Sequence, residues 1–281
     1  MELRLCALEA LRIADPQQKV AAVHDLWAQL ATVLIADRRP ALASAEAAAL
    51  PGRPERPALV HPARVHKRSP ASVAGRAALL HAICHIEFNA INLALDAVWR
   101  FDGMPRAYYL DWLRVASEEA LHFRLLREQL QSLAHDGRRW DYGDFAAHDN
   151  LWAMCEKTAD DIVARMALVP RTLEARGLDA TPLIQAKLRQ VGAPDAQGKS
   201  AAPDALRAVA ILDIILRDEI GHVAVGNHWY RWLCARDGLA PIAHYRVLAD
   251  RYAAPRLRPP FNHAARQRAG FTDEELAALL L

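Results

Sequence analysis

The sequence predicts an all-α protein, a four-helix bundle with an added N-terminal helix and arm and added C-terminal helices. Hydrophobic residues make up 53% of the 281 residues, with many Ala and Leu, and glycine contributes only 12. This composition favours helices over strands. Two Glu-x-x-His strings, at 119–122 and 219–222, each lie in a long helical segment. Spacing i to i+3 puts both side chains on one helix face, and two such pairs with two further Glu residues can hold two metal ions inside a four-helix bundle.

Charge and cysteine pattern argue against several classes of protein. The net charge is +2 and the pI about 8.4, so charge alone does not indicate nucleic-acid binding. The four cysteines are far apart without a C-x-x-C motif, as expected of buried thiols in a reducing compartment. The first residues carry charges and no apolar signal core, and no run of about 18 apolar residues occurs. We therefore expect a cytoplasmic protein without a membrane span.

For residues 1–69 the sequence predicts a helix followed by an arm, both packed on the bundle. Apolar residues recur at three- and four-residue spacing over 16–36, the period of an amphipathic helix. Prolines at 51–57 and Pro62 then interrupt any regular helix and most strand pairing. We expect 37–69 to be an extended arm, with a flexible linker between two domains as the alternative.

Residues 70–281 predict the bundle and its C-terminal extension. Gly103 and Pro105 mark the turn between the first two long helices. In the third helix, Pro170 should kink or split the helix and Gly177 should end it. The four long helices are predicted over 72–99, 106–134, 150–176 and 204–235.

Shorter helices are predicted after the third long helix and in the tail. Thr181 as N-cap and Pro182 at the first helical position indicate an extra helix over 182–191. Two further helices are expected at 241–252 and 273–280. No strand pattern is recognisable.

The candidate metal ligands are predicted to share one depth in the bundle. Glu87 lies 16 residues before Gly103 and Glu119 lies 16 residues after it, so an antiparallel helix pair places both at one level. A carboxylate on an apolar helix face is costly to bury unless a cation compensates it. The midpoint between Glu174 and Glu219 falls near residue 196, in a predicted loop. The extra helix predicted in this second hairpin makes the argument that both residues lie at one depth weaker than for Glu87 and Glu119. The predicted ligands are Glu87, Glu119, His122, Glu174, Glu219 and His222.

Four carboxylates and two imidazoles suit two iron ions, with manganese as the alternative metal. Carboxylates that bridge two ions hold them about 3.5–4 Å apart. A lone Glu-x-x-His string is usually a solvated pair, so the prediction depends on the second copy and on the matched depth of Glu87. On the third helix, Glu156 and Asp160 share the broad face of Glu174, and the kink at Pro170 leaves the choice among them open.

A second group of residues is expected to support the ligands, because a metal-bound imidazole normally donates its other N–H to an acceptor. Asp218, Asp213 and Asp160 are all within helical reach of such an imidazole. Glu118 and Asp218 point off the apolar face and are interpreted as surface or supporting groups. The residues expected around the ligands are His81, His85, His148 and Asp218, although each histidine could instead serve packing and His148 could cap the third helix.

Several short sequence segments together form a pattern that resembles a known family. One of them, Pro51-Gly52-Arg53-Pro54, lies in the arm. The others occupy 80–87, 116–123, 142–143, 147–149, 168–171, 173–179 and 217–223. Over about 70–280 the chain resembles an uncharacterised bacterial family of ferritin-like proteins, and more distantly the bacterial di-iron hydroxylases that modify tRNA. The resemblance implies a ferritin-like bundle and the metal ligands named above. It does not supply a substrate.

We expect a di-metal oxidoreductase in which two iron ions reduce dioxygen and a small molecule or tRNA of unknown identity is oxidised or hydroxylated. The sequence does not decide whether an electron donor takes part or whether the protein forms a homodimer. One alternative is a ferroxidase or other iron-handling protein, although minimal ferritin chains are much shorter. The other is an RNA-binding module with a vestigial bundle, or simply a solvated basic face. Its basic residues are Arg53, Arg56, Arg64, His66, Lys67 and Arg68 in the arm and Arg251, Arg256, Arg258, Arg266 and Arg268 in the tail.

Overall fold

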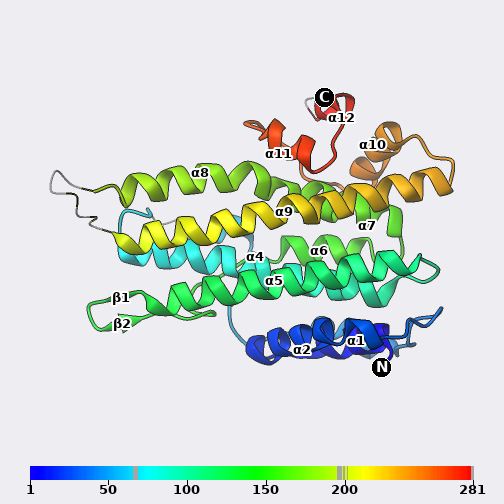
Figure 1. Ribbon diagram of the computed structural model, residues 1–281, viewed down its shortest axis with the longest axis horizontal. Coiled ribbons are helices and arrows are strands. Elements are labelled where there is room, and N and C mark those ends of the chain that lie inside the picture. Colours follow the sequence, from blue (N-terminus) through cyan, green and yellow to red (C-terminus); the bar gives the residue numbers. More distant parts are fainter. Residues whose placement is uncertain (66–68, 195–197, 199, 201, 280–281) are drawn as a thin grey trace.

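Long helices that lie side by side form the body of the protein (Figure 1). The computed structural model describes residues 1–65, 69–194, 198, 200 and 202–279. It confirms the all-α class. The four longest helices are α4 (Val73–Arg100), α5 (Arg106–Ser132), α8 (Ala175–Val191) and α9 (Pro203–Arg236). Helix α4 packs on α5, α5 packs on α9, and α8 packs on α9, so α9 connects both halves of the body.

Helices α4 and α5 form the predicted hairpin. The Ser72 side chain caps α4 by accepting a hydrogen bond from the backbone N–H of Gly75. Gly103, with φ of +70°, lies in the turn before α5, as the sequence predicts. Helix α4 is long and apolar enough to cross a membrane, but 78% of its most apolar window is buried inside the protein, as in the core helix of a soluble protein. A cytoplasmic location stays a prediction.

A two-stranded hairpin that the sequence did not predict follows α5. Strands β1 (Ala134–His135) and β2 (Arg138–Arg139) pair antiparallel. Asp136 and Gly137 between them have φ of 50° and 74°. Positive φ at both central residues is the geometry of a tight hairpin turn, for which Asp-Gly is a preferred sequence. The strands are too short to show an alternating pattern.

The third helical region differs most from the prediction. It comprises α6 (Asn150–Lys157), α7 (Ile162–Leu168), a π-helical segment η3 (Val169–Glu174) and α8. The change of helix type at Pro170 agrees with the expected break. The predicted end at Gly177 is wrong, and so is the separate helix over 182–191, because α8 runs through both positions.

Helix α8 continues through Pro182 because another part of the chain satisfies the backbone there. A proline cannot donate to the carbonyl four residues earlier, here that of Leu178. The Asn262 side chain donates to this carbonyl instead, with 3.1 Å between Nδ2 and O. A tail residue 84 positions away therefore replaces the missing helical hydrogen bond.

The N-terminal segment holds more helix than predicted. Helix α1 (Leu3–Arg12) was not predicted, and α2 (Pro16–Ala28) ends well before residue 36, followed by the 3₁₀ turn η1 (Leu30–Thr32). Helix α1 packs on α4 and α2 on α5. The arm contains α3 (Ser44–Ala48) and η2 (Pro62–Arg64), so it is not uniformly extended. The division into 1–69 and 70–281 stays a prediction.

Three short helices cover the opposite side of the long helices (Figure 1). They are α10 (Pro241–Arg251), α11 (His263–Arg268) and α12 (Asp273–Ala278). Helices α10 and α12 lie where the sequence predicts them, except that Leu280 falls outside the described residues, whereas α11 was not predicted. Thr272 and Glu275 cap α12 reciprocally.

A buried ion pair joins α4 to α7. Asp96 is fully buried, and its carboxylate lies 2.5 Å from Arg165 Nη1 and 2.6 Å from Arg100 Nη2. Arg165 also donates to Thr158 Oγ1 at the end of α6. Burial alone would raise the pKa of Asp96, but Arg165 and Arg100 together hold it below its ordinary value.

We expect Asp96→Asn to lower the free energy of unfolding at pH 7 by about 3–5 kcal/mol, because it leaves Arg165 buried without a counterion. Since the folded-state pKa of Asp96 lies below the unfolded value, its contribution is complete above about pH 4 and declines as pH falls through the folded-state pKa. The difference between parent and variant should therefore narrow in acid. Urea unfolding at several pH values measures it, with Glu128→Gln at an exposed ion pair as control. Equal stability of parent and Asp96→Asn at pH 7 would contradict the expectation.

Candidate metal centre

Four buried acidic and imidazole side chains converge between α4, α5 and α9. They are Glu87 on α4, Glu119 and His122 on α5, and Glu219 on α9. One ligand atom from each lies within 4.8 Å of the ligand atoms of the other three. The matched depth inferred for Glu87 and Glu119 thus corresponds to real proximity. This group could hold a metal ion.

His222 and Glu174, the other two predicted ligands, lie at the border of this group. His222 Nδ1 is 2.9 Å from Glu119 Oε1 and 3.7 Å from Glu219 Oε1. Glu174 is buried at the end of η3, where the charges of Glu219 and Glu119 act on its carboxyl group. The structure therefore brings His222 into contact with the group of four and buries Glu174 where the charges of that group act on it; these six residues are called the cluster below. Their role as metal ligands stays a prediction.

The structure favours Glu174 over the two alternatives on the third helical region. Both carboxylate oxygens of Glu174 are buried without a hydrogen-bond partner. Glu156 is exposed on α6 and accepts a hydrogen bond from Trp152 Nε1, and Asp160 is exposed after α6. Of the three, only Glu174 shares the buried surroundings of the other predicted ligands.

The π-helical segment brings Glu174 close to α9. A Cβ atom at Gly226 would lie 2.5 Å from Pro170 Cβ, so only glycine on α9 allows η3 this close. Thr172 Oγ1 donates to the carbonyl of Ala167, which supports the backbone where the helix widens. Single π turns inside α-helices occur frequently at functional sites.

Several polar atoms of the cluster lack the partners that burial normally requires. A buried donor or acceptor without a hydrogen bond costs about 1–3 kcal/mol. Among the described residues the atoms are Glu87 Oε2, Glu174 Oε1 and Oε2, and Glu219 Oε2, whereas Glu119 Oε1 and His222 Nδ1 lie 2.9 Å from each other. A bound cation would complete the coordination of these atoms, so the residues present fit a metal centre.

The pKa values describe a cluster that holds protons when no cation is bound. Burial, followed by the charge of Glu119, raises the pKa of both Glu87 and Glu219. Burial would also raise the pKa of Glu119, but His222 and His122 lower it well below its ordinary value. Burial would lower the pKa of His122, but Asp218, Glu119 and Glu87 raise it to about 12. A cation must displace such protons, so metal binding should strengthen as pH rises.

Two acidic residues outside the cluster support its imidazoles in a reciprocal arrangement. His122 Nε2 on α5 lies 3.1 Å from Asp218 Oδ2 on α9, and His222 Nε2 on α9 lies 2.7 Å from Glu118 Oε2 on α5. Asp218 thus takes the supporting position expected of it. Asp213, the alternative on the same helix, contacts Gln185 and Arg189 instead.

The sequence interpretation left Glu118 between a surface and a supporting role. The sequence did contain a signal for the supporting role. An acidic residue, Glu118 or Asp218, directly precedes each Glu-x-x-His string. Helical geometry places this first residue about 100° from the Glu, away from the cluster but within reach of the neighbouring helix.

Two of the three candidate histidines, His81 and His85, hold the loop after β2. The backbone N–H of Gly143 donates to His81 Nε2, and His85 Nδ1 lies 2.9 Å from the Tyr142 hydroxyl. His148 does not cap α6, where Asp149 is the N-cap residue. Within the described ranges, no hydrogen bond joins these three histidines to the six predicted ligands. We interpret His81 and His85 as anchors of the loop.

The basic residues of the RNA-binding alternative are partly occupied by internal contacts. Arg266 is fully buried and lies 2.6 Å from Asp179 Oδ2. Arg53 lies 2.7 Å from Asp149 Oδ2. His66, Lys67 and Arg68 fall outside the described residues. Arg266 therefore cannot contribute to a basic binding surface, and the charge of Arg53 is partly neutralised by Asp149.

Comparison with known proteins gives a family and a relative. The family model described as "Protein of unknown function (DUF455)" matches residues 12–277. An uncharacterized protein of Haemophilus influenzae is 48% identical over 278 residues, which span 95% of this chain and 90% of that protein. No solved structure matches the chain. The resemblance to an uncharacterised family is thereby confirmed.

Replacing either outer acid should weaken metal binding about 10–100-fold, because each imidazole loses the acceptor that orients its other nitrogen toward the cluster. The variants are Asp218→Asn and Glu118→Gln. Competition with a chromophoric chelator measures the affinity for Mn²⁺ and Co²⁺. Asp213→Asn, on the same helix but paired with Arg189, should bind like the parent. Unchanged affinity in both outer-acid variants would show that these contacts do not orient the ligands.

Proposed function

The chain belongs to the DUF455 family of proteins of unknown function, and we propose that it is a non-haem di-metal carboxylate enzyme, an oxygen-dependent oxidase or hydroxylase with two iron ions. One observation carries the proposal. Six buried side chains, four carboxyl groups and two imidazoles, come together with several of their polar atoms unpaired. Such a set of atoms is costly to bury unless cations compensate it.

The distribution of these side chains over the helices supports a ferritin-like bundle. Glu87 comes from α4 and Glu174 from the end of η3 directly before α8, while α5 and α9 each contribute a Glu-x-x-His pair. One Glu from each of two helices and one such pair from each of the other two is the ligand pattern of ferritin-like di-metal carboxylate proteins. We infer that α4, α5, α8 and α9 are the four helices of the bundle.

The donor set supports two divalent ions. Four carboxylates balance the charge of two such ions, and oxygen and imidazole ligands suit iron, with manganese as the alternative. When bound, a pair of ferrous ions would supply the electrons for reduction of dioxygen. The carboxyl groups of Glu87 and Glu219 would release their protons when metal binds, and Asp218 and Glu118 would hold the imidazoles in position. Glu119 and His122 are completely buried.

Iron handling is the second candidate, because the same ligands would serve a ferroxidase. The covering elements favour an enzyme: α1, α2 and α10 to α12 enclose the long helices on two sides, and a storage cage does not require them (Figure 1). In the enzyme, dioxygen is a co-substrate, an electron donor restores the ferrous state, and a small molecule is the organic substrate.

Metal content is the first test of the proposal. Protein purified without chelator and reconstituted anaerobically with Fe(II) should contain about two iron ions per chain. Glu119→Ala and His222→Ala each remove a buried member of the cluster and should reduce the content sharply. Elemental analysis gives the number, and Glu156→Ala at the exposed position on α6 is the matched control. A parent protein without specific metal would refute the di-metal centre.

Aerobic titration with Fe(II) separates the enzyme from the iron-handling protein. An enzyme centre should stop taking up iron at about two ions per chain, because it has no storage space beyond the ligands. Optical detection of ferric iron follows the titration, and light scattering gives the size of the assembly. Continued iron oxidation far beyond this ratio in a large hollow assembly would favour storage.

A further inference from the structure

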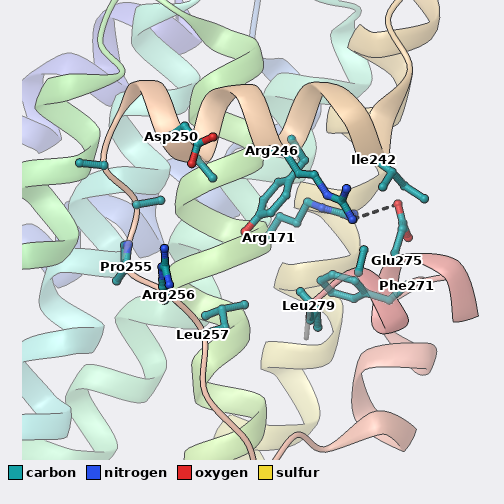
Figure 2. A pocket seen from close by; sticks show the side chains of 15 residues that line it. Arg171, Ile242, Arg246, Asp250, Pro255, Arg256, Leu257, Phe271, Glu275 and Leu279 are labelled. Atoms are coloured by element: carbon teal, nitrogen blue, oxygen red, sulfur yellow. Dashed lines mark ion pairs between the residues drawn. The ribbon is translucent and has the colours of Figure 1, made fainter. Parts of the chain in front are cut away.

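A hollow of about 550 Å³ lies against the π-helical segment, on the side of the C-terminal helices. Its walls come from α10, the chain at 253–257 and α12, and Arg171 of η3 forms part of its base (Figure 2). Cavities of roughly 300–1,000 Å³ typically bind small molecules and cofactors. The hollow therefore has the size of a small-molecule site.

The base of the hollow is firmly held. Arg171 is buried, its Nη2 atom lies 2.9 Å from Glu275 Oε1, and its Nη1 donates to Asn227 Oδ1. The Phe271 ring lies 4.6 Å from the Arg171 guanidinium. On the α10 side, the Tyr245 hydroxyl lies 2.9 Å from the Oγ1 of Thr172, which also belongs to η3. The base is thus preorganised, which lowers the entropic cost of binding a ligand.

The charges of the walls favour an anion. Three arginines and two carboxylates line the hollow. Glu275 is shared by Arg171 at 2.9 Å and Arg231 at 2.5 Å, so its charge is already neutralised. Exposed Arg246 and Arg256 make no ion pair in the portion of the chain that the structure describes, and only Asp250 opposes them. The hollow therefore carries more positive than unpaired negative charge, and the positive charge belongs to guanidinium groups. Guanidinium groups bind carboxylate and phosphate groups through paired hydrogen bonds.

The remaining wall is apolar. Ile242 on α10, Leu257 in the following segment and Leu279 after α12 line the hollow together with Phe271 (Figure 2). A fully polar ion such as inorganic phosphate would leave this surface uncovered. A ligand that buries an apolar body there gains roughly 25 cal/mol for each Å² of apolar surface removed from water.

We propose that this hollow binds a small organic anion, a carboxylate or phosphate group on an apolar body, with Arg246 and Arg256 holding the anionic group. The bound molecule rests on η3, the segment that ends at Glu174. Because Arg171 in the base of the hollow and Glu174 belong to the same segment, we assign the hollow as the substrate site of the proposed enzyme. This role rests on the proposed function, whereas the binding itself does not.

Binding is tested on the full chain after treatment with a chelator, with hexanoate and phenyl phosphate as probes and hexanol as the neutral analogue. Ligand-observed NMR detects binding and calorimetry gives the affinity. Both anions should bind, and hexanol at least about tenfold more weakly. The double variant Arg246→Gln/Arg256→Gln should lose about tenfold or more in affinity for the anions, a factor that corresponds to about 1.4 kcal/mol.

The matched control is Arg251→Gln/Arg258→Gln, which removes the same charge from α10 and the following segment at exposed positions outside the hollow. It should bind like the parent, and thermal unfolding should show both double variants folded. Three results would overturn the proposal: no binding of either anion, equal losses in the two double variants, or hexanol binding as tightly as hexanoate.

Substrate function has its own readout. A probe bound in the hollow should change the rate of oxygen uptake by the iron-loaded parent and leave that of Arg246→Gln/Arg256→Gln unchanged. A probe that binds without any effect on oxygen uptake would overturn the substrate role. Absence of metal would refute the proposed function while anion binding persists, and loss of binding with full metal content would refute this inference alone.

Discussion

The central constraint on this structure is the burial of four carboxyl groups in an apolar interior. Such groups must be neutralised by protons, by neighbouring cations or by bound metal ions. The protein combines these solutions: Glu119 is stabilised as an anion between two imidazoles, while burial and its charge favour the protonated forms of Glu87 and Glu219. The elements that meet at the cluster would repel one another without this compensation, so the arrangement of α4, α5, η3 and α9 depends on it.

The reciprocal contacts between α5 and α9 give the centre an internal symmetry. Each helix provides a Glu-x-x-His pair to the cluster and an acid that supports the histidine of the other helix. A shift of one helix along the other would break both contacts at once, so the two imidazoles are positioned together. The Pro170–Gly226 contact adds η3 to the same rigid group. Precise placement of the candidate ligands in this way supports the proposed metal centre over a chance cluster of acidic residues.

Periodicity was sufficient to predict α4, α5 and α9, and the rise per residue with the position of one turn predicted the convergence of Glu87 with Glu119. Periodicity could not predict contacts between residues that are distant in the sequence. The passage of α8 through Pro182 depends on a hydrogen bond from Asn262, which a local pattern cannot reveal. Helix α1 was missed because its stability derives from packing on α4. The role of Glu118 also depended on the neighbouring helix, although the repeated acidic residue offered a signal.

The π-helical segment has a consequence for how this family can tolerate changes in length. A π turn accommodates one residue more than the α-helix around it. Deleting a residue between 169 and 174 would convert the segment into regular α-helix and remove the wide turn between the Pro170 contact and Glu174. The length of this segment should thus be as strictly inherited as the identity of the residues within it.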